Sequence, residues 1–506
     1  MNASSHRFLA AAVALLLMLA ALFAAPVRSS VDAAAALFYV NSVAPSGGDG
    51  LTWTTAFNNL QTAINKVQTT AGCASFVCEI WVAQGVYQPL SNSTIYINGG
   101  YEYIYGGFAG GETDLSQRDW RAHPTTLLGN NSGVVYAYGW LGLLDGFTIT
   151  GGEHGGEMGR GGGIYLQCGS PTLSNLNIVG NAADNYGGGV YAYAFGCSNS
   201  SYSPNFLNVV FSGNSATYGG GAAFLGGHPA LVNTAFYNNV ATQGDGIYDY
   251  TSSPTLTNVT MYMDVIHNNI QSKPAIQNSI LWGTTLSIVN EESTSIPTIT
   301  YSLVEGCYFG IWNTACGTDL GHNLLDEDPE FVDVILPDLH LEGSSPVIDQ
   351  GNSAFVPPYV TAIDLDGNAR VVGAAIDLGV YEFQSANIPP VVTNFSKTGW
   401  KNSDILLSAA DFTSHFSDAD GNSLVSVKVT FLPAQGVLYL AAAPVTLNQV
   451  IPLANLGSLH FTPPPDWGGT VTFGWSASDG TAFAPSPAVA TLKVFSFRQF
   501  LPAILK

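Results

Sequence analysis

A glycine-rich phrase that recurs along the chain constrains its fold more than any other feature. "GGGIYL" begins at Gly161, "GGGVYA" at Gly187, "GGGAAF" at Gly219 and "GDGIYD" at Gly244, with spacings of 26, 32 and 25 residues. Such a period, with Gly or Pro at the corners and no helical periodicity, is typical of a β-solenoid in which each repeat forms one coil. The glycines then occupy corners where a positive φ or a close approach of backbone excludes a side chain.

A second phrase, Pro-x-apolar-x-Asn, follows each glycine phrase and ends in asparagine. Equivalent residues of stacked coils lie about 4.8 Å apart, so their amide side chains can hydrogen-bond from coil to coil. The sequence therefore predicts a structural ladder made of Asn175, Asn208, Asn233, Asn258 and Asn278. A third phrase, apolar-x-x-Asn, ends at Asn181, Asn214 and Asn239.

The N-terminus predicts export of the chain. His6 and Arg7 precede an apolar run from Phe8 to Ala25, which indicates a secretory signal within residues 1–36; an uncleaved membrane anchor is the alternative. The 506 residues carry 36 acidic and 14 basic side chains, a net charge of -22, and no basic patch that would bind nucleic acid. We expect a secreted or cell-surface protein with no transmembrane segment after signal removal.

Six cysteines in an exported chain predict three disulfides. Two pairs lie within single Gly/Ser-rich loops, and the third pair precedes the asparagine phrases of neighbouring coils, where stacked Cα atoms meet the distance that a disulfide needs. The predicted bonds are Cys73–Cys78, Cys168–Cys197 and Cys307–Cys316.

A short amphipathic helix is predicted before the clear repeats. Phe57, Leu60, Ile64 and Val67 have helical spacing, and Thr54 or Thr55 could cap the first turn. This helix would cover the open end of the solenoid, where an exposed strand edge otherwise invites association.

Several segments resemble known families. "FYVNSVAPSGGDGLTWTTAFNNLQTAI" and "IYGGFAGGETDLSQRDWRAHPTTLLG" are similar to the start of bacterial secreted right-handed parallel β-helix proteins of the pectin-lyase-like fold, and "FSGN" with "YGGGA" resembles polymorphic outer-membrane protein repeats. "DEDPEFVDVILPDLHLEGSSPVIDQGNSAF" and "DLDGNARVVGAAIDLGVYEF" resemble the choice-of-anchor Q domain, which closes such β-helices.

The C-terminal hundred residues resemble bacterial cadherin-like repeats with an immunoglobulin fold. "ADFTSHFSDADGNSL" and "LHFTPPPDWGGTVTFGWSASDGTAFAPSPA" carry this resemblance, which implies a β-sandwich. The expected all-β chain comprises a signal (1–36), a parallel β-helix with its helical cap (37–325), a closing region (326–385), a linker (386–391), a β-sandwich (392–496) and a tail (497–506).

Two acidic turns are candidates for calcium. Oxygen ligands gathered in one turn suit Ca²⁺, and the cadherin-like resemblance supports a site formed by Asp418, Asp420, Asn422 and Asp479. The second turn contains Asp364, Asp366 and Asn368, where a plain Asp-Gly turn is the favoured interpretation.

Parallel β-helices include polysaccharide lyases and hydrolases, so catalysis is a hypothesis to weigh. The best candidates lie in the loop "EHGGEMGR", namely Glu153, His154, Glu157 and Arg160. Lyases need a carboxylate cluster with a basic residue, and hydrolases need paired carboxylates. The chain lacks the Asn-Thr-Asp and Gly-His-Gly phrases of polygalacturonases, so a solvated loop is the favoured interpretation.

Tyrosines recur at one position of the repeat. Tyr165, Tyr191 and Tyr248 alternate with inward residues and could stack as an outward strip that contacts the faces of sugars, or lie buried under loops. The function expected from the sequence is non-catalytic adhesion or contact with extracellular polysaccharide or cell-surface glycans. A polysaccharide lyase or glycoside hydrolase and a structural envelope spacer are the alternatives.

Overall fold

The computed structural model describes residues 36–73, 77–89, 93–156, 159–197, 202–308, 310–324, 326–357, 363–384, 387–419 and 422–496. The predicted signal (except residue 36) and the predicted tail lie outside these ranges. The chain divides into two compact units, the first ending at Gln384 and the second beginning at Ser385. Within the described residues, no helix is long and apolar enough to cross a membrane.

The first unit is a parallel β-helix, as the repeats predict. Its largest sheet has 15 strands, eleven of them in one continuous order. These eleven are β1 (Leu37–Val40), β2 (Glu79–Ala83), β5 (Tyr103–Phe108), β8 (Leu143–Thr150), β11 (Thr172–Val179), β14 (Asn205–Ser212), β17 (Ala230–Tyr237), β20 (Thr255–Tyr262), β22 (Ala275–Gln277), β25 (Thr298–Thr300) and β27 (Thr318–Asp319). The branches are β3 (Gly85–Tyr87), β6 (Thr125–Leu128), β23 (Ile280–Trp282) and β26 (Leu303–Val304).

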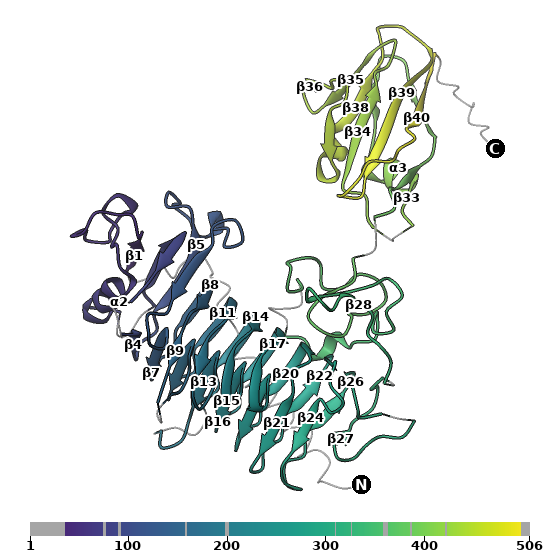
Figure 1. Cartoon of the computed structure of the whole chain (residues 1–506). Helices are drawn as coiled ribbons and strands as arrows, with labels where there is room; N and C mark the ends of the chain where they lie inside the picture. Colours follow the sequence, from purple (N-terminus) through teal and green to yellow (C-terminus); the bar gives the residue numbers. More distant parts are fainter. Residues whose placement is uncertain are drawn as a thin grey trace, which may run out of the picture. The chain divides into compact units, whose positions relative to one another are not determined.

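Two further parallel sheets complete the coils. The eight-stranded sheet contains β4 (Ile95–Asn98), β7 (Val135–Tyr138), β10 (Ile164–Gln167), β13 (Val190–Tyr193), β16 (Ala222–Leu225), β19 (Ile247–Tyr250), β21 (Ile266–Asn269) and β24 (Ile288–Asn290). The four-stranded sheet contains β9 (Glu153–His154), β12 (Ala182–Ala183), β15 (Ser215–Tyr218) and β18 (Val240–Gln243). Figure 1 shows the strands of successive coils stacked side by side along the first unit.

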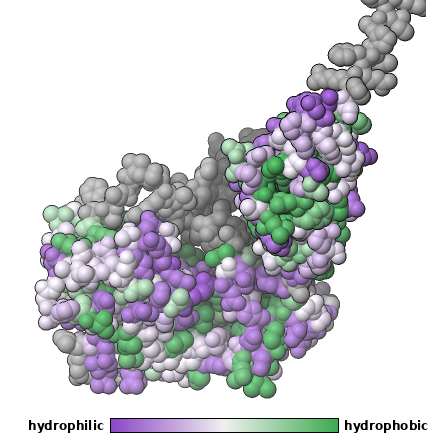
Figure 2. Space-filling model, turned by 90° about the horizontal axis from the view of Figure 1, so that it is seen from above, coloured by the Kyte–Doolittle hydropathy of each residue, from purple (hydrophilic) through white to green (hydrophobic). Residues whose placement is uncertain are grey.

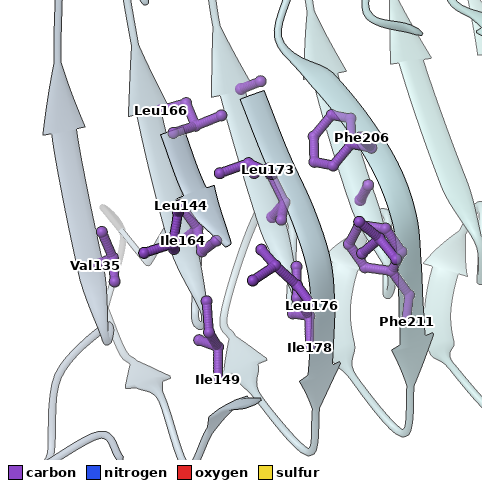
Figure 3. Packing of buried hydrophobic residues seen from close by; sticks show 14 of the residues in the cluster. Val135, Leu144, Ile149, Ile164, Leu166, Leu173, Leu176, Ile178, Phe206 and Phe211 are labelled. Carbon is purple, nitrogen blue, oxygen red and sulfur yellow. The ribbon is translucent and has the colours of Figure 1, made fainter. Parts of the chain in front are cut away.

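The core of the β-helix lies between the sheets and repeats from coil to coil. Ile164 pairs with Val190, which pairs with Ala222, and all three are buried. Leu173 of β11 and Phe206 of β14 pair in the same way, and Figure 3 shows such side chains pointing into the interior from facing strands. Because strands alternate their side chains, the intervening residues face outward.

The glycine phrases lie at the corners before the eight-stranded sheet. Gly187 has a φ of 64°, and a Cβ on the next residue, Gly188, would lie 2.4 Å from the carbonyl oxygen of Ser215 in the following coil. The first glycine therefore provides a left-handed turn, and the second permits close contact between coils. Both reasons predicted from the repeats are confirmed at this corner.

The predicted asparagine ladder forms, with one change at its end. The Nδ2 of Asn208 donates to the Oδ1 of Asn175 at 3.2 Å, and the same bond joins Asn233 to Asn208 at 3.1 Å and Asn258 to Asn233 at 2.9 Å. The Nδ2 of Asn278 instead donates to the backbone oxygen of Asn352 at 3.0 Å. The last rung thus binds the closing region, where a fourth ladder bond, between Asn278 and Asn258, was expected. All five asparagines have φ between 50° and 54°, a left-handed conformation that Asn tolerates.

A second ladder lies inside the core. Asn181 donates from its Nδ2 to the Oδ1 of Asn214, and Asn214 donates in the same way to Asn239, both at 3.0 Å. The Nδ2 of Asn239 donates to Asp264 at 2.6 Å. All four side chains are buried, so the third sequence phrase encodes a polar spine whose members satisfy one another.

The three disulfides are the pairs predicted from the sequence: Cys73–Cys78, Cys168–Cys197 and Cys307–Cys316. The amphipathic helix is also present, as α2 (Leu60–Thr69), with Leu60, Ile64 and Val67 buried. Its cap differs from the prediction, because the Oδ1 of Asn59 accepts from the backbone nitrogen of Thr62. Thr54 and Thr55 belong instead to a preceding 3-10 turn, η1 (Trp53–Thr55).

The segment after β27 packs against the outer face of the largest sheet. It contains the antiparallel pair β28 (Phe331–Asp333) and β29 (Asp338–Leu341) and the turn η3 (Ser353–Phe355). Phe331 and Leu339 pack with Ile280 and Leu303, and the backbone nitrogen of Val380 donates to the Oγ1 of Thr260 at 3.0 Å.

The second unit is a β-sandwich of antiparallel sheets with one parallel pair. One sheet contains β31 (Phe395–Trp400), β40 (Ala488–Phe495), β39 (Gly469–Ser478), β34 (Ser426–Phe431) and β37 (Val450–Pro452). The other contains β32 (Ile405–Leu406), β38 (Leu459–Thr462), β35 (Val437–Leu440) and β36 (Ala443–Pro444). Trp475 and Phe412 of α3 (Ala409–Thr413) meet edge to face at 5.1 Å in its core. Figure 2 shows hydrophobic residues interspersed with hydrophilic ones over the surface that it presents.

Candidate functional site: a tyrosine face on the β-helix

Tyrosines cover the outer side of the eight-stranded sheet. Register places Tyr136 of β7 beside Tyr165 of β10, and Tyr165 beside Tyr191 of β13. We define the tyrosine face as this outward set with its neighbours: Tyr96, Tyr136, Tyr138, Tyr165, Tyr186, Tyr191, Tyr193, Phe195, Tyr218, Tyr248 and Tyr250. The three tyrosines predicted from the sequence belong to it.

The rings form a continuous stack along the axis of the β-helix. From Tyr96 to Tyr136, Tyr165 and Tyr191, successive ring centroids are 5.4, 4.9 and 5.0 Å apart. These separations are those of favourable offset or tilted aromatic pairs. Because each of these coils places one tyrosine at the same position, the rings form a continuous ribbon along the β-helix axis.

The ribbon bends at the coil that carries Ala223 in place of a tyrosine. Tyr186 and Tyr218, from the corners before the strands, fill the gap that this small residue leaves. Their rings stack at 4.9 Å, and Tyr218 then contacts Tyr248 at 5.0 Å. Tyr186 and Tyr218 therefore keep the row of rings continuous past Ala223.

Burial differs sharply along the face. Tyr96 is 41% exposed and Tyr138 is 44% exposed, whereas Tyr191 is 1% and Tyr248 is 3% exposed. Of the two alternatives for Tyr165, Tyr191 and Tyr248, an outward strip or burial, Tyr191 and Tyr248 follow the second and lie beneath neighbouring rings, while Tyr165 is half-buried. The exposed part of the face is its N-terminal end.

Burial also keeps the hydroxyl groups of the inner tyrosines neutral. It raises the pKa of Tyr191 and Tyr165, while the positive charge of Arg160 opposes both shifts. For Tyr248, burial raises the pKa to about 12, although the hydrogen bond from Asn269 opposes the rise. These hydroxyls therefore remain uncharged donors and acceptors across the physiological pH range.

The proposed catalytic loop borders this face. The guanidinium of Arg160 lies 6.0 Å from the ring centre of Tyr186 and 5.8 Å from that of Tyr191, so it makes cation-π contacts. His154 is held through its Nδ1 by the backbone oxygen of Arg160 at 2.6 Å, and Glu153 is exposed. Glu157 lies outside the described residues. Arg160 thus packs against tyrosines, and the described part of the loop brings together no carboxylate pair.

The first calcium candidate is a set of turn-forming side chains. The Oδ1 of Asp418 accepts from the backbone nitrogen of Asn422 at 3.1 Å, and the Oδ1 of Asp479 accepts from Thr481 and Ala482 at 2.6 and 2.7 Å. The Oδ2 of Asp479 accepts from Asn387 at 3.0 Å. Asp420 lies outside the described residues.

The second acidic turn is similar. Asp364 accepts from the backbone nitrogen of Asn368 at 2.8 Å, and the Oδ2 of Asp366 is 2.7 Å from the Nε2 of His340. Across the described ranges, no cluster of three or more His, Cys, Asp or Glu side chains is placed to hold a metal ion.

Sequence reasoning missed most members of the tyrosine face. One signal was available, because "VYAY" occurs both at Val135–Tyr138 and at Val190–Tyr193, which places Tyr136 and Tyr138 in the same register as the predicted strip. Tyr186 and Tyr218 also recur, each directly before a triple glycine as "YGGG", but this position does not indicate that their rings reach the face from the corner.

The fold and this surface define a parallel β-helix protein that carries an aromatic face and is joined to a β-sandwich. Comparison with known protein families finds no family that the chain matches, and comparison with curated proteins finds no matching relative.

Proposed function

We propose that this chain is a secreted or surface-attached, non-catalytic protein that contacts polysaccharide or cell-surface glycans through the tyrosine face. The observation that carries the proposal is the unbroken stack of rings, whose exposed end presents Tyr96 and Tyr138. Aromatic rings bind the apolar faces of sugars, and a row of rings parallel to the β-helix axis suits an extended chain.

Charge narrows the class of glycan. The net charge of -22 repels polyanions, so uncharged glycans suit this protein better than acidic ones. The packing of Arg160 against tyrosine rings supports a role in contact over one in catalysis.

The finer domain assignments belong to the same proposal. The segment 326–385 resembles a choice-of-anchor Q domain and the segment 392–496 a cadherin-like repeat, which supports attachment at a bacterial surface. The proposal that the sandwich binds Ca²⁺ rests on the cadherin-like resemblance alone.

The test is a glycan array with the mature full-length chain, together with a polysaccharide-degradation assay. We expect retention of at least one neutral polysaccharide, lost in Tyr96→Ala plus Tyr138→Ala and kept in the control Tyr439→Ala, which alters a partly buried tyrosine of the sandwich. Release of reducing or unsaturated ends that disappears in Glu153→Gln or Arg160→Gln would overturn the non-catalytic proposal. Unchanged binding by the double variant would remove the tyrosine face as its cause.

A further inference from the structure

A cavity of about 370 Å³ lies on the outer side of the largest sheet, near the C-terminal coils of the β-helix. It is lined by Ala275, Ile276, Gln277, Thr298, Thr300, Tyr301, Leu320, His322 and Phe355. The strands that line it, β22 and β25, belong to a different sheet from the tyrosine face, and Leu320 and His322 follow β27 of that same sheet. A volume of this size is within the range of small-ligand sites.

The walls of this cavity interrupt the outer asparagine ladder. Gln277 pairs with Thr300, so Tyr301 takes the place of Asn278 in the next coil. The backbone nitrogen of Tyr301 donates to Gly321, which brings His322 to the corresponding place one coil further. Where earlier coils carry asparagine, the last two coils therefore carry aromatic rings.

The aromatic residues keep the unusual backbone of the ladder. Tyr301 has a φ of 47° and His322 a φ of 61°, close to the 50° to 54° of the asparagines. Asparagine and histidine accept this left-handed conformation readily, whereas the bulky side chain of Tyr301 does so at a cost. Strain of this kind at a cavity wall is a reason to look for function there.

The two rings stack on each other. Their centroids are 4.3 Å apart with an interplanar angle of 14°, and Phe355 meets Tyr301 nearly edge on at 5.8 Å. Phe355 comes from η3, so the closing region contributes the third wall.

The strands beside the stacked pair add uncharged polar groups. Gln277 donates from its Nε2 to Thr257 at 2.9 Å and also carries an amide oxygen, and Thr298 provides a hydroxyl. The hydroxyl of Thr300 donates to the backbone oxygen of Gly321 at 2.8 Å, which leaves its oxygen able to accept. None of the nine lining residues is Asp, Glu, Lys or Arg.

We infer that this cavity is a binding subsite for one neutral sugar ring. The stacked Tyr301–His322 pair would contact the apolar side of the sugar ring with the part of its surface that lines the cavity, and Gln277, Thr298 and Thr300 would hydrogen-bond the sugar's hydroxyl groups. The subsite is separate from the tyrosine face and does not require that face to bind glycan.

Saturation-transfer NMR of the full-length chain with glucose, galactose, mannose, N-acetylglucosamine and glucuronate tests this inference. We expect millimolar binding of at least one neutral sugar, weakened about tenfold or more in Tyr301→Asn, because that variant loses the ring contact. Asparagine occupies the equivalent position in the five preceding coils, so the variant should fold. An unchanged melting transition of the β-helix checks that it does.

The matched control is Tyr439→Ala in the sandwich, which should bind the free sugars as the wild type does. The comparison is repeated in the Tyr96→Ala plus Tyr138→Ala background, which removes any binding at the tyrosine face. Binding by the wild type of none of the neutral sugars, unchanged binding in Tyr301→Asn, or tighter binding of glucuronate than of glucose would each overturn the subsite. Loss of polysaccharide retention in the double variant bears on the tyrosine face alone, so the two proposals fail separately.

Discussion

The β-helix and the β-sandwich are stabilised by different kinds of contact. In the β-helix, each side chain meets its own equivalent in the next coil, as the Asn181, Asn214 and Asn239 spine shows. In the sandwich, unlike residues from distant elements converge, and Phe395 and Phe412 both pack edge to face on Trp475. Contacts in the β-helix are spread evenly along its length, whereas those of the sandwich are concentrated around one large ring.

The sandwich should suffer the largest effect from a single change. Trp475 is completely buried, so Trp475→Ala leaves a cavity and lowers the free energy of unfolding of this unit by about 4 kcal/mol. Differential scanning calorimetry of the full-length chain should show one transition lowered and the β-helix transition unchanged. A shift of both transitions would show that the two units do not unfold independently.

The inner spine of the β-helix should be the next most sensitive feature. The Oδ1 of Asn214 accepts from both nitrogens of Asn181, and its Nδ2 donates to Asn239 and to the backbone oxygen of Ile178. Asn214→Ala breaks these buried bonds and should lower the free energy of unfolding of the β-helix by about 3 kcal/mol.

The matched control for the inner spine is Asn208→Gly in the outer ladder. Glycine keeps the left-handed backbone at this partly exposed position, so we expect a loss of about 1 kcal/mol or less. Chemical denaturation followed by tryptophan fluorescence measures both variants. Equal losses would mean that burial does not distinguish the two ladders.

The end of the inner spine makes the stability of the β-helix depend on pH. Burial raises the pKa of Asp264 to about 8, although its hydrogen bonds from Asn239 oppose the rise. An unfolded aspartate titrates near pH 4, so the folded state binds one more proton between about pH 4 and pH 8. The stability contributed by this group is therefore complete below pH 4 and declines as pH rises through 8.

Replacing the acid with the amide of the other rungs should remove this decline. Asp264→Asn should be more stable than the wild type by about 2 kcal/mol or more at pH 9 and differ little at pH 4. Calorimetry of the β-helix transition across this range checks the prediction. A stability difference that does not change with pH would contradict it.

The evenly repeated contacts explain which parts of the structure could be predicted from the sequence. Repeat register alone predicts that Asn175 bonds Asn208 and that Cys168 lies near Cys197, because both are contacts between equivalent positions. It does not predict the burial of Tyr191, which depends on Tyr186 reaching over it from a corner. Nor does it predict the Tyr301 cavity, since Phe355 arrives from η3 outside the repeats. The sandwich has no repeat, and there a family resemblance predicted only the fold.

The smallest expected effect concerns calcium at the sandwich and tests whether this unit has a ligand of its own. The carboxylates of Asp418 and Asp479 accept backbone hydrogen bonds within their turns, and because a carboxylate has about four acceptor sites these bonds are compatible with coordination of a cation. A weak site whose Kd for Ca²⁺ is a few-fold below the Ca²⁺ concentration stabilises the folded unit by about 1 kcal/mol. Millimolar Ca²⁺ should therefore raise the melting temperature of the sandwich transition slightly, while Mg²⁺ and the variant Asp418→Asn should show no rise. Because the β-helix transition is recorded in the same scan, a general salt effect would move both transitions, and an unmoved sandwich transition would remove calcium from the proposed function.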